Sequence, residues 1–145
     1  MFYVVVFYVL PISLMVTMVL AACVFLRQNK SIYIIYPCDI PEQNIQRIEN
    51  YAKDLEEIGY VVNYLYRYSK KGDLTDVETA LVKKKAISGC GRVDVFWDAN
   101  SKGSHIDLGM AIAFDKPIVL VDYAHSDDES GYLKTIRGLK QKMGY

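Results

Sequence analysis

The stretch VDVFWDANSKGSHIDLGMAIAFDKPIVLV, residues 93–121, decides the fold. It begins with a short apolar and β-branched run, Val93 to Trp97, which is typical of a strand buried on both faces. A polar loop over 99–103 follows, and apolar residues at helical spacing then predict a helix that begins near Ser104. The run 117–121 predicts another strand. Strand, helix and strand in this order predict a parallel βαβ unit.

The same alternation continues outside this stretch. Residues 31–36 and 60–66 are apolar, β-branched and aromatic runs that predict two more strands. Apolar residues at helical spacing predict helices over 41–59, 73–87 and 132–143. We therefore expect an α/β fold of the Rossmann-like (flavodoxin-like) type, with a parallel sheet of four to five strands and helices on both faces. In such sheets, ligands bind beyond the carboxyl ends of the strands, where the strand order reverses.

The N-terminal residues 1–26 contain no charged side chain and form a nearly continuous apolar run. Because this length can span a bilayer, we expect one transmembrane helix over 1–28, followed by the α/β domain over 29–145. Arg27 and Lys30 follow the apolar run. The positive-inside rule then predicts a single-pass membrane protein whose C-terminal domain is cytoplasmic.

Two alternatives for the N-terminus remain open. Leu20-Ala21-Ala22-Cys23 resembles a bacterial lipobox, which would make Cys23 the lipid-modified N-terminus of a lipoprotein outside the cytoplasm. The apolar run continues past Cys23, as it does in a spanning helix. A cleaved secretory signal normally begins with basic residues, and none precedes the apolar run here.

The composition excludes several function classes. The 145 residues carry a formal net charge of +0, which argues against nucleic acid as a partner, because nucleic-acid-binding surfaces need clustered Lys and Arg. The triplet Lys83-Lys84-Lys85 is interpreted as a solvated helix face. No cluster of His, Cys or carboxylates has the spacing of metal ligands, so we expect no metal and no cofactor.

Polar residues gather where the strand 93–97 meets the next helix. The unbonded amides of a helix N-terminus favour an anion, most simply a phosphate. A glycine lets the phosphate approach the backbone, serine hydroxyls add donors, and the aspartate after the strand either binds a sugar hydroxyl or caps the turn. The candidate substrate-binding residues of this segment are Asp98, Asn100, Ser101, Gly103 and Ser104.

Asp107 lies about one turn further along the predicted helix. A carboxylate repels an anion, so Asp107 should face the uncharged part of a ligand, as a nucleophile or as a hydrogen-bonding group for a sugar. A purely structural alternative is that Ser104 and Asp107 form a capping box, with Asp in place of Glu. His105 is interpreted as a surface or supporting group.

Residues 101–121 resemble the active-site segment of nucleoside 2-deoxyribosyltransferases and the related deoxynucleoside 5'-monophosphate N-glycosidases. The matching pattern is Gly103, three residues, Asp107, one residue and Gly109, with Lys116-Pro117 before the next strand. Asp107 stands where the family has Glu. The family also carries an acidic residue on the preceding helix, and residues 83–86 offer no equivalent.

The resemblance implies roles for several residues. Asp107 would be the nucleophile that attacks the anomeric carbon and displaces the base, Ser101 would bind the phosphate, and Tyr36 would lie near the sugar and take part in catalysis. Gly109 would complete the substrate-binding pattern. The family assembles its sites across subunits, so a homo-oligomer is implied.

The expected function is a membrane-anchored domain that binds a nucleotide or nucleoside and cleaves or transfers the N-glycosidic bond of a (deoxy)nucleotide through a carboxylate nucleophile. Two alternatives stay open. One is a catalytically inactive nucleotide-binding sensor that kept the pocket and lost the chemistry. The other is an NAD-cleaving enzyme, because TIR domains resemble this fold and also place a carboxylate near an N-glycosidic bond.

Overall fold

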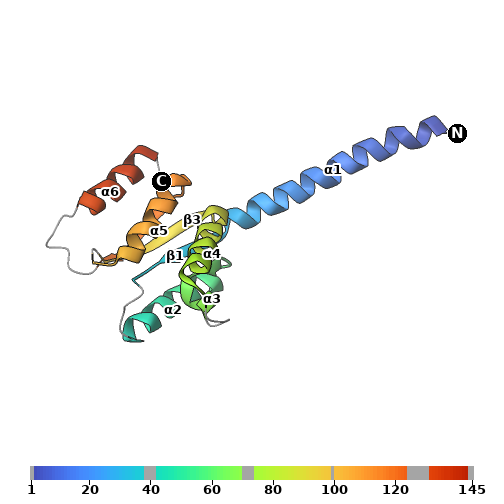
Figure 1. Cartoon of the computed structure of the whole chain (residues 1–145). Helices are drawn as coiled ribbons and strands as arrows, with labels where there is room; N and C mark the ends of the chain where they lie inside the picture. Colours follow the sequence, from blue (N-terminus) through green and yellow to red (C-terminus); the bar gives the residue numbers. More distant parts are fainter. Residues whose placement is uncertain (1, 38–41, 70–73, 99, 124–130, 144–145) are drawn as a thin grey trace.

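The computed structural model describes residues 2–37, 42–69, 74–98, 100–123 and 131–143. Its helices and strands follow the predicted alternation (Figure 1). In chain order they are α1 (Phe2–Asn29), β1 (Ser31–Ile35), α2 (Glu42–Glu57), β2 (Val61–Asn63), α3 (Leu65–Ser69), α4 (Asp76–Gly89), β3 (Arg92–Trp97), α5 (Lys102–Ala113), β4 (Ile118–Tyr123) and α6 (Gly131–Met143).

The strands form one parallel sheet. Within the described ranges it has four strands, in the order β2-β1-β3-β4. Each strand is followed by a helical crossover before the next strand along the chain, which is what parallel pairing requires. The predicted α/β fold with a parallel sheet is therefore confirmed.

Helices cover both faces of the sheet. On one face, which we call the α5 face, side chains of α4, α5 and α6 pack against β1 and β3. On the other, which we call the α2 face, α2 packs against the alternate side chains of the same strands. The apolar helix residues buried on the α5 face are Ile87, Leu108, Ala111 and Ile136, and those on the α2 face are Ile48, Ala52 and Leu55.

The second predicted strand is shorter than expected. The apolar run 60–66 predicted a strand throughout, but β2 ends at Asn63 and α3 begins at Leu65. Arg67 closes this turn, because its guanidinium donates to the carbonyl of Val62 at 2.9 Å, pairs with the carboxylate of Glu56 and lies 4.7 Å from the ring centre of Tyr64. These tertiary contacts outweigh the strand propensity of the aromatic residues.

A carboxylate is buried in the middle of β3. Asp94 is fully buried, and its two oxygens accept hydrogen bonds from Arg92 at 2.7 and 2.8 Å. The hydroxyl of Tyr51 on α2 donates a third hydrogen bond to Asp94 at 2.8 Å. Burial, reinforced by the neighbouring Asp94, raises the pKa of Tyr51 to about 12. This network ties α2 to the sheet.

Replacing Tyr51 with phenylalanine should lower the free energy of unfolding by about 1.5–3 kcal/mol, because a hydrogen bond to a charged acceptor is lost. The raised pKa means that this difference is full below pH 10.0 and shrinks as the pH rises toward 12. Urea denaturation measures both effects. Tyr60→Phe is the control, because Tyr60 contacts Arg92 through its ring, 5.4 Å from the guanidinium, and Phe keeps that ring.

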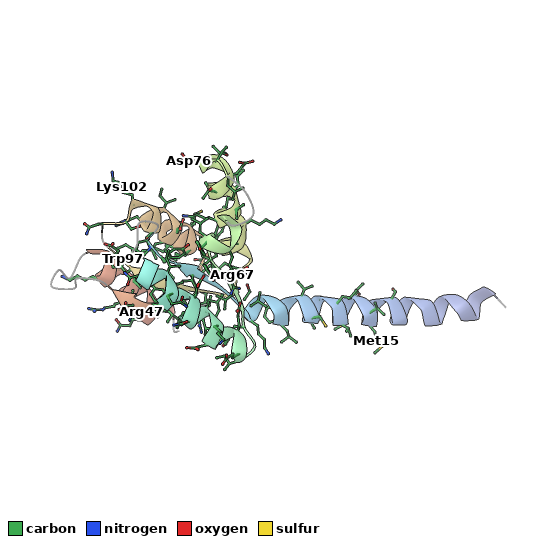
Figure 2. All side chains as sticks on the ribbon, turned by 90° about the horizontal axis from the view of Figure 1, so that it is seen from below. Met15, Arg47, Arg67, Asp76, Trp97 and Lys102 are labelled. Atoms are coloured by element: carbon green, nitrogen blue, oxygen red, sulfur yellow. The ribbon has the colours of Figure 1, made fainter. Side chains whose placement is uncertain are left out.

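The N-terminal helix α1 extends away from the sheet as one long rod (Figure 1). The side chains of residues 13–26 are exposed, and Met15 points into open space in Figure 2. Only Lys30 separates α1 from β1, and its carbonyl accepts a hydrogen bond from the amide of Val61 at 2.8 Å. Over the described ranges, no helix reaches the length and mean hydropathy that membrane crossing requires, so the predicted transmembrane helix is not confirmed.

Candidate functional site

The strand order creates a switch point between β1 and β3. From β1 the chain crosses to β2 on one side of the sheet, and β3 lies on the other side of β1. Crossovers that leave in opposite directions open a crevice at the carboxyl ends of such strands. Tyr36 follows β1, and Asp98 and Asn100 follow β3. The structure therefore brings these three predicted residues to one edge of the sheet.

Helix α5 begins two residues earlier than predicted. Ser101 is the N-cap residue, with extended backbone angles, and its Oγ accepts a hydrogen bond from the amide of Ser104 at 3.3 Å. The capping box of Ser104 and Asp107 is therefore wrong, because Ser104 is already inside the helix. Ser104 is buried and donates its hydroxyl hydrogen to Ser101 Oγ at 2.9 Å. The two serines are thus hydrogen-bonded to each other, and Ser101 is the more exposed of the two.

The first turn of α5 has backbone amides that can donate hydrogen bonds to an anion. The amides of Lys102 and Gly103 have no carbonyl to bond within the helix, because a helix leaves its first amides without such partners. Ser101 Oγ accepts from Ser104, which leaves its own hydroxyl hydrogen to donate outward. Asp98 turns the chain into this position, since its carboxylate accepts from the amide of Asn100 at 2.9 Å.

An imidazole lies beside this turn. His105 Nδ1 is 2.6 Å from the carbonyl oxygen of Ser101, and its ring meets the ring of Trp97 edge to face at 4.9 Å between centres. Because a carbonyl only accepts, Nδ1 must carry the hydrogen. His105 therefore supports the loop backbone, in agreement with its interpretation as a supporting group.

Asp107 lies on the side of α5 that faces α4. Its side chain is 4% exposed, and Oδ2 accepts a hydrogen bond from Lys83 Nζ at 2.8 Å. Oδ1 is also buried and has no hydrogen-bond partner within the described residues. Burial raises the pKa of Asp107 above its ordinary value, while the hydrogen bond and charge of Lys83 act in the opposite direction. The carboxylate is thus held by one oxygen only.

The interpretation of Lys83-Lys84-Lys85 as a solvated face is wrong for its first member. Lys83 is 8% exposed, whereas Lys84 and Lys85 are exposed. Consecutive helix residues point in directions about 100° apart, so one lysine of the triplet faces the neighbouring helix α5. Lys83 is the residue beside the predicted nucleophile that sequence reasoning missed.

Tyr36 and Asp107 lie in different surroundings. The hydroxyl of Tyr36 accepts a hydrogen bond from the amide of Tyr66 at 2.9 Å, and its ring packs against Tyr64 with the cluster of the α2 face. Asp107 belongs to the helix of the α5 face. The catalytic role of Tyr36 stays a prediction. Gly109 follows Asp107 on an exposed part of α5, where a side chain would meet open space.

An ion pair at the same edge of the sheet also escaped sequence reasoning. Arg47 on α2 contacts Asp122 near the end of β4 at 2.6 Å. The pairing of β3 with β4 shifts register between Val95 and Phe96, which places Asp122 opposite Phe96 on the α2 face. No spacing in the sequence relates Arg47 to Asp122, because the contact depends on this irregularity.

The capping role of Ser101 yields a prediction. Ser101→Ala should lower the free energy of unfolding by about 1 kcal/mol, because the amide of Ser104 loses its acceptor. It should also weaken the binding of inorganic phosphate, measured by isothermal titration. Thr75→Ala is the matched control, since Thr75 caps α4 in the same manner. Equal loss of phosphate binding in both variants would contradict a ligand role for Ser101.

Comparison with known proteins finds similarity to solved structures. No protein-family model matches the chain, and no curated protein matches it in sequence. The fold is similar to that of a CMP N-glycosidase. That glycosidase is BcmB from Clostridium botulinum. Its structure aligns with a TM-score of 0.60 and 23% sequence identity, over 75% of this chain and 81% of the glycosidase chain. The match shows a shared fold.

Proposed function

We propose that this chain binds a nucleotide at the N-terminus of α5 and cleaves or transfers its N-glycosidic bond, with Asp107 as the nucleophile. The observation that carries the proposal is the carboxylate of Asp107, which is anchored through Oδ2 and, among the described residues, keeps Oδ1 without a partner. The solved structure with a similar fold is that of a CMP N-glycosidase, which supports the same class of reaction.

In the proposed binding mode the nucleotide lies along α5, with its phosphate at the first turn of the helix and its sugar near Asp107. The phosphate lies on the amides of Lys102 and Gly103 and on the hydroxyl of Ser101. Asp107 is five residues beyond Lys102, about 7.5 Å along the helix axis, which leaves room for a pentose between phosphate and carboxylate. The sugar hydroxyls face Asp98 and Asn100. Because Asp107 is buried, side chains around it must move when the sugar approaches.

The proposed reaction has two steps. Oδ1 of Asp107 attacks the anomeric carbon, the bond from that carbon to the base breaks, and the base leaves with the bonding electrons. The product is a glycosyl ester on Asp107. A water molecule then attacks the anomeric carbon and breaks the ester bond, which restores the carboxylate, and the proton that the water loses balances the proton that the departed base takes up. If a second base attacks in place of water, the reaction is a transfer. Asp107 must be ionised for the first step.

The test is product analysis with the purified full chain. Ribo- and deoxyribonucleoside 5'-monophosphates, the matching nucleosides and NAD are incubated separately, and released bases are separated and identified by chromatography. We expect free base from monophosphates and less from nucleosides. Release of nicotinamide from NAD in place of these products would favour the NAD-cleaving alternative, and absence of all products would refute an N-glycosidase.

A second function, nucleotide binding without chemistry, is favoured by a specific observation. Asp107 is one methylene shorter than the Glu of the resembled family, and it is both buried and paired with Lys83. Misplacement by about 1 Å costs on the order of 10²-fold in rate. Saturable binding of a monophosphate in isothermal titration, with no base released over the same time, would establish this sensor.

Membrane attachment through residues 1–26 with a cytoplasmic C-terminal domain is part of the same proposal. The exposed apolar side chains of α1, among them Leu14 and Phe25, and the basic residues Arg27 and Lys30 support it. Fractionation of cells into membrane and supernatant, with protease added from outside, tests both attachment and sidedness. Loss of a lipid-sized mass in Cys23→Ser would favour the lipoprotein instead.

We further propose that the chain forms a homo-oligomer. Helices α4 and α5 carry large apolar side chains exposed to solvent, at Val77, Leu81 and Ile106. A second copy of the chain would remove such surfaces from water. Light scattering after size exclusion should give a mass of two or more chains, and Leu81→Glu should reduce it. A single-chain mass for the unaltered protein would refute the proposal.

A further inference from the structure

The ion pair between Lys83 and Asp107 is not explained by the features described so far. Lys83 and Asp107 lie on neighbouring helices, 24 residues apart in the sequence, and their side chains are 10% and 4% exposed. A buried lysine and a buried carboxylate each lose hydration, and such pairs are often no more stable than apolar residues of similar size. Stability alone does not explain the pair.

The two carboxylate oxygens of Asp107 have different surroundings. Oδ2 receives the hydrogen bond of the Lys83 ammonium at 2.8 Å, and Oδ1 is buried without a hydrogen bond from any residue that the structure describes. A buried acceptor without a donor is costly, so the arrangement needs a reason. One anchored oxygen fixes the plane of the carboxylate, and the other keeps its lone pairs for a ligand atom.

A largely apolar cluster lies between α4, α5 and the sheet. Its members with polar atoms are Tyr33, Cys90 and Trp97, and the buried Ser104 lies three residues before Asp107 on α5. On α5 itself, His105 is engaged with the carbonyl of Ser101. Burial raises the pKa of the Cys90 thiol, which keeps it neutral. Within the described residues, Lys83 is the cation that contacts Asp107.

We propose that Lys83 is a positioning residue for Asp107: it keeps the buried carboxylate ionised, binds Oδ2, and thereby presents Oδ1 to the ligand. This inference rests on the proposed function for its catalytic consequence, whereas its electrostatic part concerns Asp107 alone.

The test compares Lys83→Met with Lys84→Met. Lys84 is the next residue on α4 and is exposed, so the control has the same composition change without touching Asp107. The first measurement is the NMR titration of the Asp107 carboxyl carbon in the full chain, which needs no turnover. We expect the pKa of Asp107 to rise in Lys83→Met and to stay unchanged in Lys84→Met.

The second measurement is the pH profile of base release. Because the pKa of Asp107 should rise in Lys83→Met, the acidic limb of the profile should move to higher pH. The factor by which this variant is slower than the unaltered protein should therefore shrink as the pH rises. A purely structural lysine would lower activity by the same factor at every pH. Lys83→Arg, which keeps the charge, should leave the limb close to that of the unaltered protein.

Each result decides the inference. An Asp107 titration that does not move in Lys83→Met overturns it, as does a uniform loss of activity across pH. Lys83→Gln serves if the Met variant does not fold, because Gln keeps a polar group but no charge and must raise the pKa of Asp107 as well. If the unaltered protein releases no base, the N-glycosidase fails and the titration still decides whether Lys83 controls the charge of Asp107.

Discussion

Asp107→Asn is expected to lower base release by roughly 10³-fold or more, because the amide oxygen is a poor nucleophile and cannot form the glycosyl ester. The affinity for a nucleoside monophosphate should change little, since the phosphate contacts come from the first turn of α5. Initial rates and isothermal titration with the same substrate separate the two effects. Both are measured on the full chain.

Asp115→Asn is the matched control for Asp107→Asn. Asp115 is exposed, follows α5, and has a positive φ of 52°, which Asn tolerates better than most residues. The control should keep full activity and stability. Base release by Asp107→Asn within a few-fold of the unaltered rate would remove Asp107 from the reaction and assign the chemistry to another group.

Lys83→Met should lower the free energy of unfolding by about 3–5 kcal/mol, because the substitution leaves the carboxylate of Asp107 buried without its cation. Urea denaturation at neutral pH measures the loss. The double variant Lys83→Met with Asp107→Leu should recover most of it, because no uncompensated charge then remains. Lys84→Met should differ from the unaltered protein by less than about 0.5 kcal/mol.

The loss in Lys83→Met should also depend on pH. In the unfolded chain Asp107 titrates at its ordinary pKa of 3.8, whereas burial raises its pKa in the folded protein, and further still without Lys83. Between these two pKa values the native state binds more protons than the unfolded chain, so stability falls as pH rises. The variant should therefore be closest to the unaltered protein at acidic pH. A loss that is constant across this range would show that Asp107 is not the source.

The order of strands and helices could be predicted because it depends on local periodicity. The apolar runs at β1, β3 and β4 are short and flanked by polar loops, and the helices repeat apolar residues at the spacing of one buried stripe. That order alone also predicts that ligands bind at the carboxyl ends of the strands, where Asp98 and Ser101 lie. The fold class and the general position of the candidate site were therefore accessible from sequence.

The details of the site depend on contacts between distant segments. Three successive lysines do not indicate which of them faces α5, because the direction of each side chain depends on the rotation of α4 about its own axis. Ser101 and Ser104 are equally good cap residues by type, and only the structure shows that Ser101 is the N-cap and Ser104 lies inside the helix. Asp94 interrupts an apolar strand, and its hydrogen bonds with Arg92 and with the Tyr51 hydroxyl become visible only in the structure.

The single residue between α1 and β1 has a mechanical consequence. A long flexible linker would let the sheet and α1 move independently. Here Lys30 is the whole connection, and its carbonyl accepts a hydrogen bond from Val61 at the start of β2. A rotation of α1 would therefore be transmitted to β1, the strand between β2 and β3. β1 is about 16 Å long, and Tyr36 follows its far end. A movement of α1 would thus reach the edge of the sheet that carries the candidate site.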